Sequence, residues 1–138
     1  MKKCLALLST LVFSASAWAG VPPQPEKCPS VATIAQNKFV TAQKATDGTY
    51  GALMLNKFDG NEMWGFVIAE IVAASSQDAL AKATAALGSL ALLSGPMYFS
   101  SNNLWGCVYS VEDGYPVLAL TPLPAQVRSA QDLLQLEK

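Results

Sequence analysis

Two cysteines are the residues of this sequence best suited to chemistry. Cys28 and Cys107 lie about 80 residues apart, and a thiol can act as a nucleophile, bind a metal or form a disulfide. A reactive thiol needs a base or a cation beside it, and the stretch NNLWGCVYSVEDGYP around Cys107 offers neither. A two-cysteine metal site needs further ligands, and the chain contains no histidine. We therefore predict a Cys28–Cys107 disulfide.

The lack of histidine also restricts catalysis. It removes Ser-His-Asp and Cys-His nucleophilic sites and ordinary catalytic zinc sites. A pair of carboxylates could still act as acid and base, and the candidates are Asp59, Glu62, Glu70 and Asp113. Asp59 and Asp113 each precede a glycine, so turn formation explains them without catalysis. We predict no catalytic residue, no metal site and no enzyme activity.

The N-terminus, MKKCLALLSTLVFSASAWAG, predicts a secretory signal peptide over residues 1–19. Lys2 and Lys3 form a basic head, an apolar run follows, and Ala17-Trp18-Ala19 has the pattern of a cleavage site. Cys4 would leave with this segment. A periplasmic or secreted location follows, and disulfides are common in such compartments.

The chain left after cleavage has 119 residues, enough for one modest domain. Seven basic and ten acidic residues give it a net charge of −3, which argues against binding nucleic acid or anionic lipid. We divide it into a proline-rich lead-in (20–27), a domain (28–122), and a tail or short helix (123–138). Residues 126–136 have apolar positions at helical spacing. No transmembrane segment is expected after cleavage.

Turn signals divide the domain into secondary-structure elements. A short helix is predicted from Ser30 to about Gln36, and Asp47-Gly48 and Asp59-Gly60 separate three predicted strands over 39–45, 50–57 and 63–73. A capping box, Ser75 with Asp78, opens a helix expected to extend over 79–93 and to end at Gly95-Pro96. Residues 97–100 are compatible with the start of a strand. Clear strands follow at 104–111 and 115–121, around Asp113-Gly114.

These elements predict a single α+β domain. Its antiparallel sheet of about five strands has the order helix, three-strand meander, helix, two-strand hairpin, with the helices on one face. Residues 63–73 are apolar on both faces, which indicates a central strand. Trp105, Cys107 and Tyr109 share one face of their strand because side chains alternate.

Aromatic and methionine side chains are the remaining candidates for a ligand site. In a domain of this size such residues are needed for the core, yet a run of them beside polar residues also suits a binding surface. The sequence leaves both interpretations open. The candidate ligand-binding residues are Met97, Tyr98, Trp105, Tyr109 and Tyr115.

Three features together resemble a family of small exported bacterial proteins that share an uncharacterised domain. They are the signal peptide, the Cys28-Pro29-Ser30 start after a proline-rich lead, and a Trp64-x-Phe66 strand followed by an alanine-rich helix. One relative is described as a hemin-binding protein, and others are associated with virulence. The resemblance implies a binding protein with hemin as its most specific candidate ligand.

Hemin binding in this chain would have to do without histidine ligation. Tyrosine or methionine would replace it at the iron, or the macrocycle would be held by aromatic stacking alone. A different class of function remains open, in which the chain is a protein–protein interaction or inhibitor domain. It would act on an envelope or host partner through a sheet edge or its C-terminal segment.

Overall fold

The computed structural model of the chain describes residues 20–123, and within them the fold is a single α+β domain. Its sheet is antiparallel throughout and has six strands, in the order β1-β2-β3-β6-β5-β4. The prediction of an antiparallel sheet with helices is confirmed, but the sheet has six strands and not five. The predicted signal peptide and the predicted C-terminal helix lie outside the described residues.

The first half of the fold follows the turn chemistry of the sequence. Helix α2 (Val31–Ala35) begins at Ser30, whose hydroxyl accepts a hydrogen bond from the Thr33 N–H. Strands β1 (Thr41–Lys44), β2 (Tyr50–Asn56) and β3 (Trp64–Ile71) then form a meander. In the β1–β2 turn, the Asp47 carboxylate accepts hydrogen bonds from the backbone N–H and the hydroxyl of Thr49.

Strand β3 contains an irregularity that simple alternation does not predict. Strict alternation would place Ile71 on the face of Val67 and Glu70 on the face of Trp64. Instead, two residues, Ala69 and Glu70, lie opposite Gly51, and Glu70 has a positive φ of 56°. This β-bulge returns Ile71 to the buried core beneath the helices and leaves Glu70 exposed.

The second half of the fold departs from the prediction at the end of the long helix. Helix α3 (Ser76–Ala86) has the predicted cap, because the Asp78 N–H donates to Ser75 Oγ and the Asp78 carboxylate accepts from the Ala74 N–H. It then tightens into the 3₁₀ turn η2 (Leu87–Ser89), and the chain continues as strand β4 (Ala91–Phe99). The predicted helix over 79–93 and its end at Gly95-Pro96 are therefore wrong in their C-terminal part.

The physical reason is that residues 87–93 form a short apolar run that suits either element. Gly88 weakens a continuing helix, and β5 (Leu104–Ser110) supplies backbone partners for β4. Strand β6 (Val117–Thr121) follows the turn at Asp113-Gly114 and inserts between β5 and β3. The second half is thus a three-strand meander, and not a hairpin.

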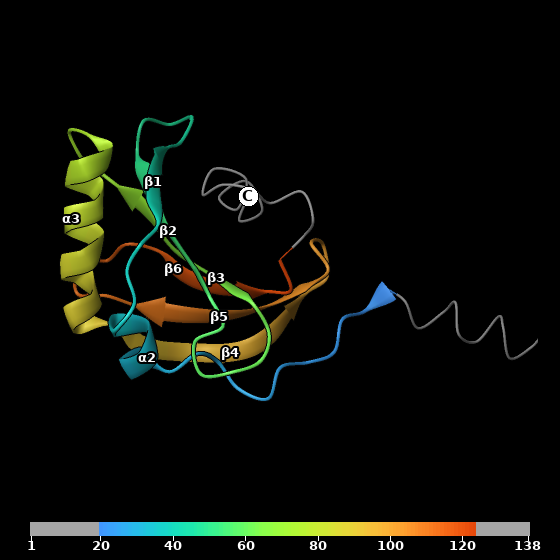
Figure 1. Ribbon diagram of the computed structural model, residues 1–138. Helices are drawn as coiled ribbons and strands as arrows, with labels where there is room; N and C mark the ends of the chain where they lie inside the picture. Colours follow the sequence, from blue (N-terminus) through green and yellow to red (C-terminus); the bar gives the residue numbers. More distant parts are fainter. Residues whose placement is uncertain (1–19, 124–138) are drawn as a thin grey trace, which may run out of the picture.

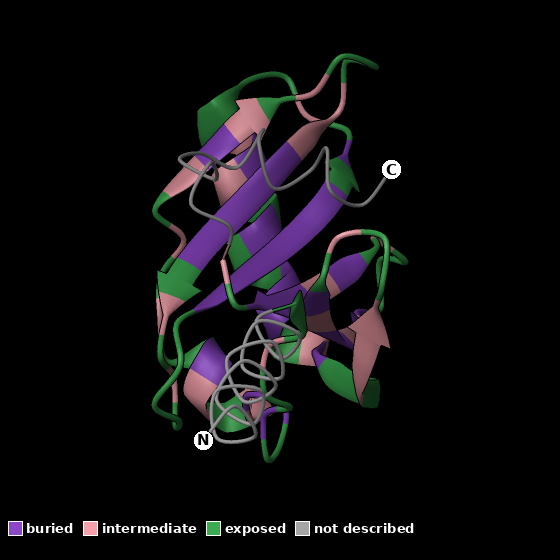
Figure 2. Ribbon diagram, turned by 90° about the vertical axis from the view of Figure 1, so that its right-hand side faces the viewer, coloured by how far each residue is buried: buried purple, intermediate pink, exposed green. Residues whose placement is uncertain are grey.

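The core is divided by the sheet into two apolar clusters. The larger contains Ile34 of α2, three alanines of α3, and sheet residues such as Phe66, Ile68 and Tyr109. The smaller, on the opposite face, contains Leu53, Val67, Ala69, Leu104 and Leu120. Figure 1 shows α3 beside the sheet, and Figure 2 shows buried residues along the central strands. No helix within residues 20–123 is long and apolar enough to cross a membrane.

Candidate binding site

The Cys28–Cys107 disulfide fixes the lead-in to the centre of the second meander. The two Cα atoms lie 5.9 Å apart, and both cysteines are buried. Cys107 points to the same face of β5 as Trp105 and Tyr109, as predicted. The predicted bridge is confirmed, and it places residues 20–30 against the helix-bearing side of the sheet. In the structure the lead-in therefore extends through Ser30, and the name is used for residues 20–30 from here on.

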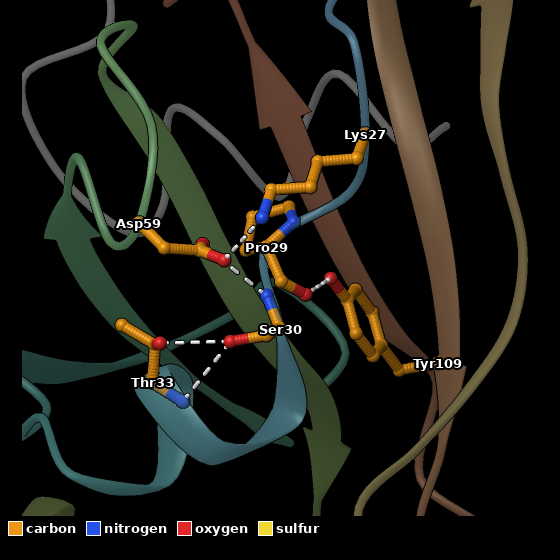
Figure 3. A network of polar contacts seen from close by, with 6 residues as sticks. All are labelled: Lys27, Pro29, Ser30, Thr33, Asp59 and Tyr109. Atoms are coloured by element: carbon orange, nitrogen blue, oxygen red, sulfur yellow. Dashed lines mark hydrogen bonds and ion pairs between the residues drawn. The ribbon is translucent and has the colours of Figure 1, made fainter.

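Polar contacts from the β2–β3 loop hold the same segment (Figure 3). The Lys27 Nζ lies 3.2 Å from Asp59 Oδ2, and the Ser30 N–H donates to Asp59 Oδ1 at 3.4 Å. Burial acts to raise the pKa of the Asp59 carboxyl, but the Lys27 ammonium and the Ser30 N–H together outweigh it. The pKa therefore lies below its ordinary value. Asp59 is thus a structural carboxylate that ties the loop to the lead-in.

Tyr109 of β5 anchors the lead-in through a hydrogen bond. Its hydroxyl donates to the Pro29 carbonyl oxygen at 2.5 Å (Figure 3). Its ring meets Phe66 edge-on, with the ring centroids 5.7 Å apart. Burial, with a smaller contribution from the Asp59 carboxylate, raises the pKa of the Tyr109 phenol well above its ordinary value. The side chain is 2% exposed. Of the predicted ligand-binding residues, this one packs in the core and anchors the backbone of the lead-in.

Tyr98 and Trp105 form an aromatic pair at the far end of β4 and β5. They are directly opposite in register, with ring centroids 5.2 Å apart and planes inclined by 49°. Both are partly exposed. Trp105 Nε1 donates to the Pro22 carbonyl oxygen at 3.0 Å, and the Tyr98 hydroxyl donates to Asn103 Oδ1. The pair therefore adjoins the start of the lead-in.

The other two predicted ligand-binding residues lie apart from this pair. Met97 pairs with Gly106 on the opposite face of the sheet from Tyr98, since neighbouring residues of a strand alternate. Tyr115 lies between β5 and β6 and packs against the larger core cluster. The structure thus brings together two of the five predicted residues, Tyr98 and Trp105.

A cavity lies between the lead-in and the β2–β3 loop. The lead-in connects it to the aromatic pair, because Pro23 lines the cavity and the preceding Pro22 accepts the hydrogen bond from Trp105. It has a volume of about 400 Å³, and its walls carry three carboxylates and one ammonium. Sequence reasoning missed it, although the proline-rich lead-in and the Asp59-Gly60 turn were both visible as separate signals. Its lining residues are Pro23, Gln24, Pro25, Glu26, Lys27, Pro29, Asp59, Gly60, Asn61, Glu62 and Trp64.

The four carboxylates weighed for catalysis do not share one place. Asp59 and Glu62 line the cavity, whereas Glu70 lies exposed on the β3 bulge and Asp113 lies exposed in the β5–β6 turn. Across residues 20–123, no group of three or more cysteine, aspartate or glutamate side chains is arranged to hold a metal ion.

Comparison with known proteins gives no match: no family model fits the chain, and no curated protein or solved structure is significantly similar to it. The resemblance to the hemin-binding relative therefore stays a prediction, and any proposal about function has to be argued from the fold and the surfaces of the described residues.

Proposed function

We propose that this chain is an exported, non-catalytic binding protein that holds a flat apolar ligand on the Tyr98–Trp105 pair. Hemin is its most specific candidate ligand. The observation that carries the proposal is the pair itself, two partly exposed rings 5.2 Å apart. The pair is bonded through Pro22 to the segment that lines a cavity of about 400 Å³. The predicted signal peptide and the buried disulfide support export to the periplasm or the cell exterior.

The chemistry of the pair suits a macrocycle. Aromatic faces bury large apolar surfaces and stack on other π systems. The Tyr98 phenol lies at the rim of the pair, hydrogen-bonded only to exposed Asn103 among the contacts described, and phenolate oxygen is a known axial ligand of haem iron. Tyr109 is a poorer candidate, because its hydroxyl is buried and donates to Pro29.

The charge of the cavity lined by the lead-in limits how hemin can lie on the pair. Its carboxylates, Glu26, Asp59 and Glu62, outnumber the single ammonium of Lys27, which is already paired with Asp59. Like charges close together repel. The two propionates of hemin should therefore point away from the cavity, with the apolar edge of the macrocycle toward it.

Titration of the purified mature protein with hemin, followed by Soret absorbance, tests this proposal. We expect saturable binding, and we expect Tyr98→Phe to change the Soret spectrum and to weaken binding about tenfold, the loss of roughly 1.4 kcal/mol. Tyr50→Phe is the matched control, since Tyr50 lies in β2, which three strands separate from β4 and two from β5. If micromolar hemin leaves the wild-type spectrum unchanged, hemin is not the ligand.

A second function, binding of a protein partner, is favoured by the exposed edge of the sheet. The first five residues of β4, Ala91–Gly95, are all exposed, with Leu92 at 47% and Leu93 at 64%. β4 ends the strand order, so its outer backbone groups can pair with an added strand.

Capture from envelope extracts separates this alternative from the first. Leu93→Lys should abolish capture of a true β4 partner, because it places a charge in the apolar edge. Val40→Lys is the matched control, since Val40 is equally exposed, at 64%, and precedes β1 at the opposite edge. A partner retained by both variants does not bind at β4.

A further inference from the structure

The sheet face opposite the helices carries an apolar surface of its own, here called the second-face cluster. Its buried members are Leu53, Val67, Ala69, Leu104 and Leu120, and Phe99, Leu118 and Leu123 pack against them. These residues come from strands β2 to β6 and from the chain just after β6. No residue of α2 or α3 belongs to the cluster.

Such a face needs a cover. An antiparallel sheet covered on one side normally alternates apolar residues inward with polar residues outward. Here β3 and β6 are apolar on both sides: Phe66 and Ala119 face the helices, whereas Val67 and Leu118 face away from them. Within residues 20–123, both helices contribute to the other cluster only.

The chain itself supplies a segment at the right place. After Thr121, the last residue of β6, Leu123 packs against the second-face cluster. The described part of the chain therefore ends at this face. Read with a helical period, Val127, Ala130, Leu133 and Leu134 fall on one side, and Arg128, Asp132 and Gln135 fall on the other.

We propose that the second-face cluster is the docking surface for residues 126–136 of the same chain, which cross it as an amphipathic helix. Eleven helical residues span about 16 Å, roughly the width of three to four neighbouring strands. This inference goes beyond the proposed function and does not depend on it. It makes the domain three-layered, with the ligand and partner surfaces confined to the helix-bearing face and the β4 edge.

The tether favours the chain's own segment over a second copy or a free apolar ligand. A segment joined at Leu123 meets the face at an effective concentration in the millimolar range, far above that of another protein molecule. The polar side of the segment, with Arg128 and Asp132, would then form the outer surface.

A matched pair of variants in the full mature chain tests the docking. Leu134→Asp should lower the thermal midpoint by roughly 5–10 °C, and it should raise the fluorescence of an added hydrophobic dye severalfold. The neighbouring Gln135→Asp should change neither. Equal effects of the two variants would overturn the proposal.

A milder double-mutant cycle keeps the test decisive even if Leu134→Asp fails to fold. Leu118→Ala and Leu134→Ala should shift the thermal midpoint less in combination than the sum of their separate shifts, because each removes one partner of the same contact. Additive shifts would contradict the docking. Coupling that appears only at high protein concentration, with a dimer on size exclusion, would assign the face to a second copy instead.

Discussion

The two three-strand meanders of the sheet are built in different ways. In the first, β1 to β3, compact turns at Asp47-Gly48 and Asp59-Gly60 join the strands. In the second, β4 to β6, the β4–β5 pairing shifts register twice, between Leu92 and Ser94 and between Ser94 and Met97. Both meanders use local turns, but the second is also bonded to Cys28, which lies 79 residues before Cys107 in the sequence.

Gly95 shows what holds the second meander. It has a φ of +126°, and a Cβ built on it would come within 2.8 Å of the Gly106 carbonyl oxygen, 2.9 Å of the Cys107 Cα and 3.1 Å of the Cys28 Sγ. The β4 backbone therefore lies against β5 and the disulfide. The second meander is thus bonded to the lead-in at the point where the β4 backbone lies closest to β5.

Loss of the disulfide should have the largest effect and should fall on the second meander. Replacing Cys28 and Cys107 together by alanine should lower the free energy of unfolding by about 4–5 kcal/mol, the chain-entropy value for a loop of this length. Urea denaturation measures it. Hydrogen exchange should show the loss of protection concentrated in β4 and β5, and equal loss in β1 and β2 would break the comparison.

Three Gly→Ala variants compare how much stability single positions of the two meanders and of the turn after α3 contribute. Gly95→Ala should cost about 3 kcal/mol, since it adds a clash with backbone to a strained φ. Gly48→Ala in the first meander should cost about 1 kcal/mol, because its φ is +91° but its surroundings are open. Gly88→Ala, in open space at the end of α3, should be neutral or slightly stabilising. Thermal unfolding gives the order, and a cost at Gly48 equal to that at Gly95 would contradict it.

Tyr109→Phe tests the link from β5 to the lead-in and should cost about 1–2 kcal/mol, because it leaves the Pro29 carbonyl without its partner. Tyr98→Phe, whose hydroxyl bonds an exposed asparagine, should cost less than about 0.5 kcal/mol.

Wild type and Tyr109→Phe should also differ in how their stability depends on alkaline pH. The pKa of Tyr109 is raised above its ordinary value of 10.0, so the folded state keeps a proton that the unfolded state releases. The corresponding stability is fully present below pH 10 and falls as the pH rises above it. Wild type should therefore lose more stability than Tyr109→Phe between about pH 10 and 11. Parallel pH profiles would show that Tyr109 does not titrate differently in the two states.

The smallest effect is expected at the exposed ion pair between the lead-in and the first meander. Lys27→Met should lower stability by no more than about 1 kcal/mol, because the Lys27 side chain is 67% exposed. Since the pKa of Asp59 lies below its ordinary value of 3.8, its contribution is complete above that pH and is lost as the pH falls below it. Acid titrations of wild type and Lys27→Met should converge there.

The elements governed by local chemistry could be predicted from the sequence. The Ser30 and Ser75 caps, the turns at three Asp-Gly pairs and the shared face of Trp105, Cys107 and Tyr109 are all confirmed. The first part of the sixth strand was missed, because residues 91–93 continue the predicted helix and only pairing with β5 makes them a strand. Its last part falls where residues 97–100 were compatible with the start of a strand. The bulge at Glu70 was missed for the same reason, since it exists only against Gly51.

The candidate site shows the same division. Residue types alone identified the cysteine pair and the set of aromatic candidates, since a chain that is predicted to be exported and has no histidine leaves few other choices. The structure decided which candidates meet: Tyr98 and Trp105 are opposite in register, Met97 lies on the other face, and Tyr109 is buried beneath Pro29. The cavity could not be predicted, because the two segments that form its walls are at least 30 residues apart in sequence.

By itself, the sequence determined the disulfide, the turns and the helix starts. The turns and helix starts depend on a few neighbouring residues, and the disulfide follows because only two cysteines remain after the predicted signal peptide. Only the tertiary structure decided where α3 ends, that β4 joins the sheet, and which aromatic residues remain accessible. Those outcomes depend on backbone hydrogen bonds and packing between distant segments, and no local pattern encodes them.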